Sequence, residues 1–438
     1  MEIVNWNSAT AEEKTTILAR PQTLPAKDIE VKISSIFAEI KNNGDSGLIN
    51  LTEKFDGVKL DDIAYDVTSA PLPDLEVADE AAILMATDNI KKFHAAQLPK
   101  PISIEIQPGV LCQKIWRPIN SVGLYIPGGS APLISTLLMM AIPAKIAGVK
   151  NIVVVTPPQK SGNQIDSGIL FVAKLLGIKT IYLAGGAQAI AALTYGTETI
   201  PAVDKIFGPG NMWVTQAKKY ASALPSGPAI DMPAGPSEVM VLADNQATPA
   251  IVAADMLAQA EHDPLAQAVL ICFSSRMALD VSLEIDKQIL KLGRRKIAAQ
   301  SVKNMIAIVS ASPSEALNII NKYAPEHLIL NAENANSYLD NISNAGSIFL
   351  GPNTPEAAGD YASGTNHVLP TAGFARNHSG LSTSSFMKSI TVQEIDDNGL
   401  KTLGPTIVRL AKMEGLDAHA ASVLIRLAQL EGGVNNGL

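Results

Sequence analysis

The side chains best suited to catalysis or metal binding gather in the second half of the chain, in turn-rich or helix-end stretches. They are Gln259, His262, Glu326, His327, Asp360, Glu414 and His419. Histidine is scarce, with six in 438 residues, and those at positions 262, 367 and 419 lie within a few positions of a carboxylate or carboxamide. Neutral imidazole together with a carboxylate is what Zn²⁺ binds best, so the pattern indicates one zinc site with an acid/base pair.

The stretch that starts at Pro249 is predicted to form a helix ending near His262, because Asp263 precedes a proline and that position avoids helical geometry. Gln259 and His262 are three positions apart and would share one face of the last turn. A capped helix end with a solvated histidine explains the same residues, and this pair alone slightly favours that interpretation.

Two further pairs lie where the chain must bend. Asp360 and His367 belong to a loop, 359–367, that is rich in glycine and asparagine, and Glu414 and His419 flank a glycine. An Asx turn accounts for the first pair and helix caps account for the second, so neither pair by itself indicates a metal site. Only their conjunction favours a shared site.

Glu326 and His327 follow a predicted helix that Pro325 ends, on a turn leading into the apolar run 328–330. A histidine beside a glutamate can act as a general base that its partner tunes or orients, a role worth about 10² to 10⁴ in rate. Two solvated polar groups at a turn are the alternative, and the catalytic interpretation is favoured.

Size and composition limit the class of protein. A chain of 438 residues exceeds the roughly 250 to 300 at which one core stops growing, so at least two domains are expected. Charged residues make up 17% and hydrophobic residues 47%, and a surface so low in charge suits burial against a second subunit. The net charge of −8 and the absence of a long basic run argue against nucleic acid as the main partner.

The two cysteines and the first residues bear on location. Cys112 and Cys272 lie in strand-like apolar stretches, where buried inert thiols are better explanations than a nucleophile or a disulfide framework. The first nine residues show no basic segment followed by an apolar core, so no signal peptide is visible and a cytoplasmic location is expected. The longest uncharged stretch, 119–144, is broken by prolines and glycines and predicts strand, turn and helix rather than a membrane span.

The order of predicted elements indicates an α/β fold. Helical spacing marks 26–42 and 78–96, and from position 121 short β-rich runs alternate with alanine-rich helical stretches. The units 122–155 and 239–273 share one layout. We therefore predict two related Rossmann-like α/β domains facing a cleft, with a helical N-terminal arm and a helical C-terminal tail. The predicted boundaries are 1–25 for the arm, 26–129 with 238–381 for the first domain, which carries the metal and catalytic residues, 130–237 for the second domain, and 382–438 for the tail.

Glycine-rich loops are the candidates for cofactor binding. No strand is followed by the Gly-x-Gly-x-x-Gly fingerprint of ordinary dinucleotide sites. Three other loops remain, 125–130, 184–188 and 207–211, and two of them run directly into predicted helices whose free N–H groups can bind phosphate. Plain tight turns explain such loops as often. A fourth loop, 232–238, could present the Ser237 hydroxyl to a substrate.

Taken together, these motifs resemble those of the histidinol dehydrogenase family, zinc- and NAD-dependent enzymes of the last two oxidations in histidine biosynthesis. The resemblance covers roughly residues 25–430 and rests on long motifs. They are Val122 to Ser130, Gly185 to Ala189, Gly208 to Asn211, Asp231 to Glu238, Gln259 to His262, Pro325 to Leu328, Gly359 to His367 and Glu414 to His419. For the first twenty or so residues the resemblance is weak and implies no catalytic role.

The resemblance also implies residue roles. It implies one zinc ion per subunit, bound by Gln259, His262, Asp360 and His419, and an acid/base pair of Glu326 and His327. Contacts with L-histidinol are implied at Ser237, Gln259, His262, His327, Glu356, Asp360, Glu414 and His419. Contacts with NAD are implied at Tyr125, Gln188 and Asn211, with the second domain as the NAD side. We expect a homodimer whose tail crosses to the partner so that sites are shared, with neither nucleic acid nor a membrane as partner.

The implied reaction needs two hydride transfers with an aldehyde between them. No cysteine is suited to capture that aldehyde, so hydration to a gem-diol is the expected route, with Glu326 activating water and His327 removing the alcohol proton. Zinc would mainly orient the substrate, and the sequence does not decide between Zn²⁺ and Mn²⁺. A zinc hydrolase acting on a small imidazole or amine substrate would not need NAD, and a non-catalytic binding protein would tolerate loss of Glu326 and His327.

Overall fold

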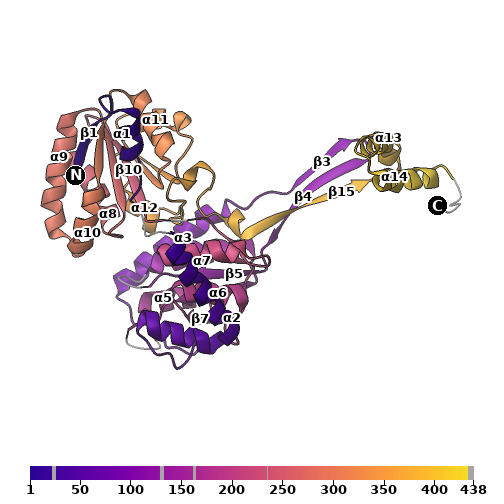
Figure 1. Ribbon diagram of the computed structural model, residues 1–438, viewed down its shortest axis with the longest axis horizontal. Helices are drawn as coiled ribbons and strands as arrows, with labels where there is room; N and C mark the ends of the chain where they lie inside the picture. The colour runs from indigo at the N-terminus through magenta and orange to yellow at the C-terminus, as the bar shows by residue number, and fades with distance from the viewer. Residues whose placement is uncertain (22–25, 129–132, 161–163, 234, 433–438) are drawn as a thin grey trace. The chain divides into compact units, whose positions relative to one another are not determined.

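The structure is a computed structural model that describes residues 1–438 except 22–25, 129–132, 161–163, 234 and 433–438. The chain divides into two units, one made of residues 1–97 and 119–386 and the other of residues 98–118 and 387–438. Unit 1 contains two six-stranded sheets with their helices, and unit 2 contains a three-stranded sheet and two helices (Figure 1). The predicted α/β fold with mostly parallel sheets is confirmed.

The first sheet of unit 1 is parallel throughout. Its order is β1 (Glu2–Asn5), β12 (Ile306–Val309), β11 (Gln267–Cys272), β10 (Glu238–Ala243), β13 (His327–Asn331) and β14 (Ser347–Leu350). Every residue of β10, β11 and β13 is buried. Strands covered on both faces must be apolar at nearly every position, which is why β10 and β11 are continuous apolar runs rather than alternating ones.

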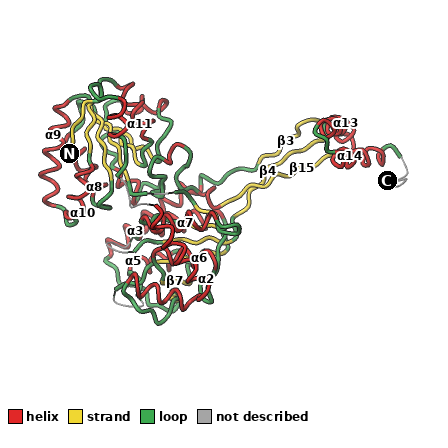
Figure 2. The backbone as a smooth tube through the Cα atoms, in the orientation of Figure 1, coloured by secondary structure: helices red, strands yellow, loops and turns green. Residues whose placement is uncertain are grey.

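Helices cover both faces of this sheet. Val239 and Val241 of β10 pack with α8 (Pro249–Ala260), α9 (Ser275–Gln288) and α10 (Arg295–Ser301). Met240 and Leu242, which alternate with them, pack with α11 (Pro313–Tyr323), and this cluster includes Leu18, just after α1 (Ala11–Ile17). Figure 2 shows the strands between these helices. The period-2 alternation of side chains thus assigns each residue of β10 to one helical layer.

The second sheet of unit 1 is parallel except at one edge. Its order is β2 (Ala64–Asp66), β7 (Thr180–Leu183), β6 (Asn151–Thr156), β5 (Ser121–Tyr125), β8 (Lys205–Phe207) and β9 (Ala229–Ile230), and β2 is antiparallel to β7. Its helices are α2 (Ala26–Asp56), α3 (Val77–Ala95), α4 (Ile134–Ala147), α5 (Ser167–Leu175), α6 (Gly186–Tyr195) and α7 (Met212–Ala223). Helices α2, α6 and α7 share a core with Val153 and Val155 of β6.

Unit 2 is an antiparallel sheet with a helical pair. Its strands run in the order β15 (Met387–Ile395), β4 (Val110–Pro118) and β3 (Ile102–Gln107). Helices α13 (Asp397–Met413) and α14 (Asp417–Leu430) pack against each other. Among the described residues, no helix combines the length and apolar character needed to cross a membrane.

The predicted domain boundaries differ from the observed sheets in three places. The arm, 1–25, contributes β1 to the first sheet. Strands β2 and β5, from the range 26–129, belong to the second sheet with the strands of 130–237 rather than to the first domain. Strand β15, from the tail 382–438, pairs with β4, so the tail shares unit 2 with residues 98–118. Sheet membership depends on pairing between distant segments, which local periodicity does not report.

Each sheet of unit 1 has one point where the strand order reverses. In the first sheet it lies between β10 and β13, and in the second between β5 and β8. Ligands of open α/β sheets bind beside such points, outside the carboxyl ends of the strands. The residues predicted to contact NAD lie at this carboxyl edge of the second sheet, whereas the predicted acid/base pair lies at the amino edge of the first.

Candidate functional site

The predicted acid/base pair lies at the amino end of the first sheet. Helix α11 ends at Tyr323, its C-cap residue Ala324 has a left-handed φ of 54°, and the proline that follows cannot continue the helix. Glu326 and His327 come next, and each is buried with 4% of its surface exposed. Strand β13 begins at His327 and pairs in parallel with β10, so the pair lies beside the start of β10.

One residue of β10 binds both members of the pair. The backbone N–H of Glu238 donates to Glu326 Oε2 at 2.9 Å, and its backbone carbonyl lies 3.2 Å from His327 Nδ1. A carbonyl oxygen can only accept, so Nδ1 carries the proton and Nε2 keeps its lone pair. His327 Nε2 has no hydrogen-bond partner among the described residues, which leaves it able to accept a proton from a substrate.

Two carboxyl groups of α12 (Glu356–Tyr361) complete the cluster. Glu356 and Asp360 are four residues apart and therefore share one face of this helix. Glu356 Oε1 lies 3.4 Å from His327 Nδ1, and Asp360 Oδ1 lies 3.7 Å from His327 Nε2. Glu326 Oε2 lies 3.7 Å from His327 Nδ1. One imidazole is thus surrounded by three carboxyl groups.

Burial controls the protonation of these groups. It raises the pKa of Glu326 and of Glu356 well above that of a free glutamate, and the negative charge of Asp360 adds to both increases. Burial raises the pKa of Asp360 to about 6. Burial first, and then the charges of His262 and His367, lower the pKa of His327 to about 3. Perturbed titrating groups gathered in this way are typical of sites that transfer protons.

Helix α8 brings the predicted metal ligands to the same place. Gln259 is fully buried, and neither its Oε1 nor its Nε2 has a hydrogen-bond partner among the described residues. Helix α8 packs against α12. His262 follows the helix and retains exposed surface, and its charge lowers the pKa of His327 and of His367. Gln259, His262 and Asp360 therefore come from two packed segments.

The donor atoms at this place fit a metal ion. Ligand atoms of His327, Glu356 and Asp360 lie within 4.8 Å of one another. Of the predicted zinc ligands, this group of described residues includes Asp360 but not His262. A buried carboxamide with no partner, as at Gln259, is costly. Coordination through Oε1 would relieve that cost.

Hydrogen bonds of His367 and Asn366 fix the loop 359–367, which contains Asp360. His367 Nδ1 lies 2.8 Å from the Asp360 carbonyl, and His367 Nε2 lies 3.2 Å from Thr136 Oγ1. Asn366 Nδ2 lies 3.1 Å from Nε2 of the buried His94. Both ring nitrogens of His367 are already partnered, so this histidine positions the loop rather than offering a ligand atom.

Glu414 and His419 lie in unit 2. Glu414 follows α13 as its C-cap residue, and His419 lies in the first turn of α14. Both are exposed, whereas the other predicted site residues belong to unit 1.

The predicted NAD residues lie at the carboxyl edge of the second sheet. Tyr125 ends β5 and Asn211 follows β8, on the two sides of the strand reversal, and Gln188 lies in the first turn of α6. The N–H of Gly186 donates to the Tyr125 hydroxyl at 3.2 Å. Gln188 Nε2 donates to Asp56 at 3.1 Å. The side chains of Tyr125 and Gln188 are thus each hydrogen-bonded to another residue at the carboxyl edge of the second sheet.

Close packing explains one of the glycine-rich loops. Gly208 has a φ of 133°, and a Cβ there would collide with the Tyr125 carbonyl oxygen. The Asn211 side chain accepts from two N–H groups at the start of α7, so it caps that helix. The tight-turn interpretation therefore applies to loop 207–211. Gly129 and Ser130 of loop 125–130, and Ala234 of loop 232–238, lie outside the described residues.

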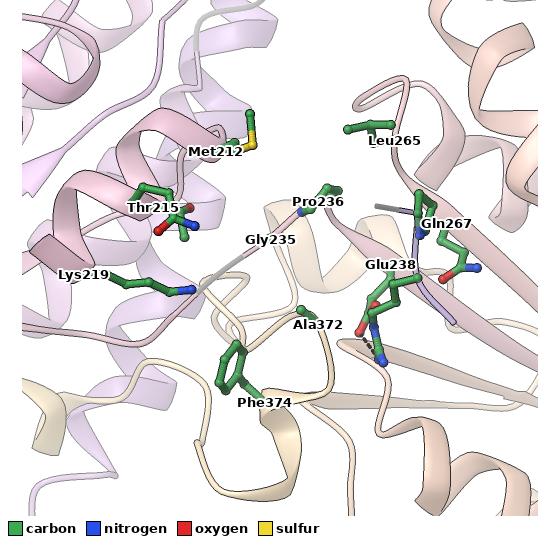
Figure 3. Close-up of a pocket in the computed structure, with 13 residues that line it drawn as sticks. Met212, Thr215, Lys219, Gly235, Pro236, Glu238, Leu265, Gln267, Ala372 and Phe374 are labelled. Carbon is green, nitrogen blue, oxygen red and sulfur yellow. Dashed lines mark hydrogen bonds and ion pairs between the residues drawn. The ribbon is translucent and has the colours of Figure 1, made fainter. Parts of the chain in front are cut away.

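A cavity of about 180 Å³ lies beside the segment that enters β10. Gly235, Pro236 and Glu238 line it together with residues of α7 and with Gln267 (Figure 3). The Glu238 carboxylate is on this wall, whereas the backbone of the same residue binds Glu326 and His327.

Sequence reasoning missed two acidic residues of the site. Asp255 lies one turn before Gln259 on α8, burial raises its pKa to about 6, and its charge raises the pKa of Glu356. A single acid in an apolar helix, four positions before Gln259, was the available signal. No sequence feature indicated that the backbone of Glu238 binds Glu326 and His327, because this contact arises from the pairing of β10 with β13.

Comparison with known proteins gives one consistent result. The family model for histidinol dehydrogenase matches residues 19–427. Histidinol dehydrogenase of Aliivibrio fischeri is 48% identical over 432 residues, covering 98% of this chain and 97% of the relative. That of Vibrio parahaemolyticus is 47% identical over 437 residues, covering 98% and 99%. The crystal structure of histidinol dehydrogenase from Elizabethkingia anophelis superposes with a TM-score of 0.93 at 46% identity, covering 98% and 99%.

Proposed function

The chain belongs to the histidinol dehydrogenase family, and from this premise we propose how its residues carry out the reaction. The protein oxidises L-histidinol to L-histidine through L-histidinaldehyde in two successive NAD-dependent steps, the last of histidine biosynthesis. The alternative of a zinc hydrolase is not favoured. The roles of single residues, the metal and the assembly are the subject of the proposal.

His327 is the base that removes the alcohol proton before each hydride leaves. The observation that carries this role is the hydrogen bond between its Nδ1–H and the Glu238 carbonyl, which leaves Nε2 unprotonated and without a partner. The pKa of about 3 that burial gives the imidazole keeps it neutral at pH 7. Any of the three carboxyl groups within 3.7 Å would, when ionised, stabilise the imidazolium that forms.

Glu326 activates water in the aldehyde step. Burial raises its pKa well above the usual value, so its carboxylate is a stronger base toward water than that of a free glutamate. Hydration of the aldehyde is the route because neither cysteine is suited to capture the aldehyde. Cys272 is buried in β11 with its pKa raised by burial, and Cys112 belongs to β4 in unit 2.

A zinc ion bound by Gln259, His262, Asp360 and His419 would orient the imidazole and amine nitrogens of the substrate. The support in unit 1 is the unpartnered buried carboxamide of Gln259 and its neighbouring carboxyl groups. Gln259 adds no negative charge, which suits a site that must attract nitrogen donors. Ser237, Glu356 and Glu414 would contact the rest of L-histidinol.

NAD would bind at the carboxyl edge of the second sheet, against Tyr125, Gln188 and Asn211. The support is their position beside the strand reversal, where open α/β sheets bind dinucleotides. Asp56, bonded to Gln188 and with its pKa raised by burial, lies at the same edge.

The active assembly is a homodimer in which the partner subunit supplies Glu414 and His419. Both residues are exposed at the junction of α13 and α14. Alternate residues of β3 in the same unit, Ile102, Ile104 and Ile106, are 49%, 52% and 64% exposed, and an apolar face of this kind favours burial against another chain. Free thiols at Cys112 and Cys272 support a cytoplasmic location.

The test is the number of NADH molecules formed per L-histidinol by purified zinc-loaded protein, followed by absorbance until the substrate is exhausted. Two NADH are expected, because both oxidations occur in one protein. One NADH would mean that the aldehyde step is missing and would overturn the role of Glu326. None would reopen the hydrolase and binding-protein alternatives.

A further inference from the structure

Arg20 forms a bidentate ion pair with Glu238, the residue whose backbone binds both catalytic side chains. Arg20 Nε and Nη2 donate to the two carboxylate oxygens of Glu238 at 2.5 and 2.8 Å. The Glu238 side chain is 2% exposed and that of Arg20 is 22% exposed. The pair is therefore largely removed from water, where a planar guanidinium matched to a carboxylate fixes geometry strongly.

The same guanidinium also holds the turn that carries the catalytic pair. Arg20 Nη2 donates to the carbonyl of Tyr323 at 2.9 Å and lies 3.5 Å from that of Ala324. These two residues end α11, two positions before Glu326. Arg20 thus binds the side chain at the start of β10 and the backbone just before β13.

Tyr323 and Gln267 enclose this arrangement. The Arg20 guanidinium stacks on the Tyr323 ring with 4.0 Å between Cζ and the ring centroid. The Tyr323 hydroxyl lies 3.2 Å from Glu238 Oε2 and 2.8 Å from Gln267 Oε1. Gln267 Nε2 in turn donates to the carbonyl of Ala19. The segment around Arg20 is therefore anchored at two consecutive residues.

We propose that Arg20 is a positioning residue of the reaction, which sets the distance between Glu326 and His327 by clamping Glu238 and the turn at residues 323–324 with one guanidinium. The inference rests on the proposed roles of Glu326 and His327. Arg20 touches neither of them, so it acts through Glu238. Its removal would let the first residue of β10 shift against β13, and a displacement of about 1 Å far from the reacting atoms can cost about 10²-fold in rate.

The cavity beside Glu238 allows a direct test. Arg20 lines it together with Glu238 and Gln267, which Figure 3 labels. Truncating Arg20 therefore enlarges a space that a small planar cation can enter. For zinc-loaded Arg20→Ala we expect a fall of about 10²-fold in kcat for both oxidations, with the KM for L-histidinol and the zinc content unchanged. Guanidinium chloride at millimolar concentration should restore kcat several-fold, and the same concentration of sodium chloride should not.

A neighbouring arginine provides the matched control. Arg376 also donates to a carbonyl at the end of α11, that of Lys322, and to that of Gly373, without contacting Glu238. Arg376→Ala should keep kcat within about twofold of the wild-type value. If it loses as much as Arg20→Ala, the turn alone matters and the proposal is overturned. It is also overturned if folded Arg20→Ala keeps its kcat, or loses kcat without rescue by guanidinium.

Arg20→Lys covers the case in which Arg20→Ala does not fold. Lysine keeps the charge beside Glu238 but lacks the fork that reaches both partners at once. A folded Arg20→Lys with reduced kcat and unchanged KM supports the proposal, and full kcat overturns it. A wild-type protein that forms no NADH from L-histidinol would refute the family reaction itself, whereas an active wild type with unaffected Arg20 variants would refute only the positioning role.

Discussion

At the scale of single residues, the protonation of the site follows from which atoms face a carbonyl and which are buried without a partner. His327 has its tautomer set by the Glu238 carbonyl, and its Nε2 is left free of partners among the described residues. Glu326 accepts from the backbone N–H of the same residue, Glu238. Adjacent side chains thus meet a donor and an acceptor of one residue, which suits the two different proton-transfer roles proposed for them.

Replacing Glu326 with glutamine should affect the two oxidations unequally. The variant keeps the hydrogen bond from the Glu238 N–H but cannot take a proton from water, so oxidation of L-histidinaldehyde should fall by about 10² to 10⁴. Oxidation of L-histidinol should fall less, because His327 still removes the alcohol proton. Single-turnover measurements from each substrate would reveal this, and equal losses in both steps would refute the division of roles.

Gln259→Met should separate metal binding from folding. Gln259 is fully buried with both polar atoms unpartnered, so removing them should leave the free energy of unfolding of the metal-free protein unchanged or raise it by about 1–3 kcal/mol. Zinc binding should be lost. Gln267→Met is the control, because Gln267 is buried but hydrogen-bonded and its loss should destabilise the protein. A metal-free Gln259→Met less stable than wild type would contradict the prediction.

His94 should make stability depend on pH. Burial lowers its pKa from 6.5, and the neutral ring bridges Ile90 and Asn366. A histidine with a lowered folded-state pKa stabilises the fold above its unfolded pKa, and this stability is lost as the pH falls below about 6.5. The excess unfolding free energy of wild type over His94→Gln should therefore shrink between about pH 7.5 and about pH 5.5. Chemical denaturation of both proteins would measure this difference in unfolding free energy. A difference that stays constant over this pH range would contradict the prediction.

At the scale of elements, the proposed site residues lie at opposite edges of the two sheets of unit 1. The predicted acid/base pair lies at the start of β13 and Ser237 precedes β10, at amino ends, whereas Tyr125 ends β5 and Asn211 follows β8, at carboxyl ends. Parallel strands commonly place ligands at carboxyl ends. At the amino edge of the first sheet, the α11 turn and helices α8 and α12 supply side chains of the proposed site that the strands themselves do not.

Gly208→Ala should disturb the proposed NAD edge. A Cβ at this residue would meet the Tyr125 carbonyl, and the φ of 133° is strained for any side chain, so we expect a loss of about 1–3 kcal/mol in stability and weaker NAD binding. Gly293→Ala is the matched control, because a Cβ there meets nothing within 4 Å. Thermal unfolding and NAD titration of both variants would check this, and equal behaviour of the two would contradict it.

At the scale of the whole molecule, the proposed site draws on both units. Glu326, His327, Asp360 and Gln259 belong to unit 1, and Glu414 and His419 belong to unit 2. The exposed positions of the last two residues are consistent with the proposal that a partner subunit supplies them.

Mixing two inactive variants tests the shared site. Glu326→Gln damages unit 1 and His419→Ala damages unit 2, so a mixed dimer that shares sites has one undamaged site. Co-refolding the two variants in equal amounts should restore about a quarter of the wild-type activity, since half of the dimers are mixed. Each variant refolded alone should show little oxidation of L-histidinaldehyde, the step in which the recovery is measured. No recovery in the mixture, with mixed dimers demonstrated, would show that each site is built within one chain.

The sequence by itself determined the α/β class, most of the strands from β5 onward and the family, because buried parallel strands are apolar at nearly every position and the site motifs are long. It also predicted that Gln259, Glu326, His327 and Asp360 carry the chemistry. Tertiary structure decided that β1 joins the first sheet and that β2 and β5 join the second, since strand pairing between distant segments leaves no local periodicity. It alone linked Arg20 to Glu238 and Glu238 to both members of the proposed acid/base pair. Those contacts join positions 218 and 88 or 89 residues apart, and a separation of that size is set by packing rather than by any pattern along the chain.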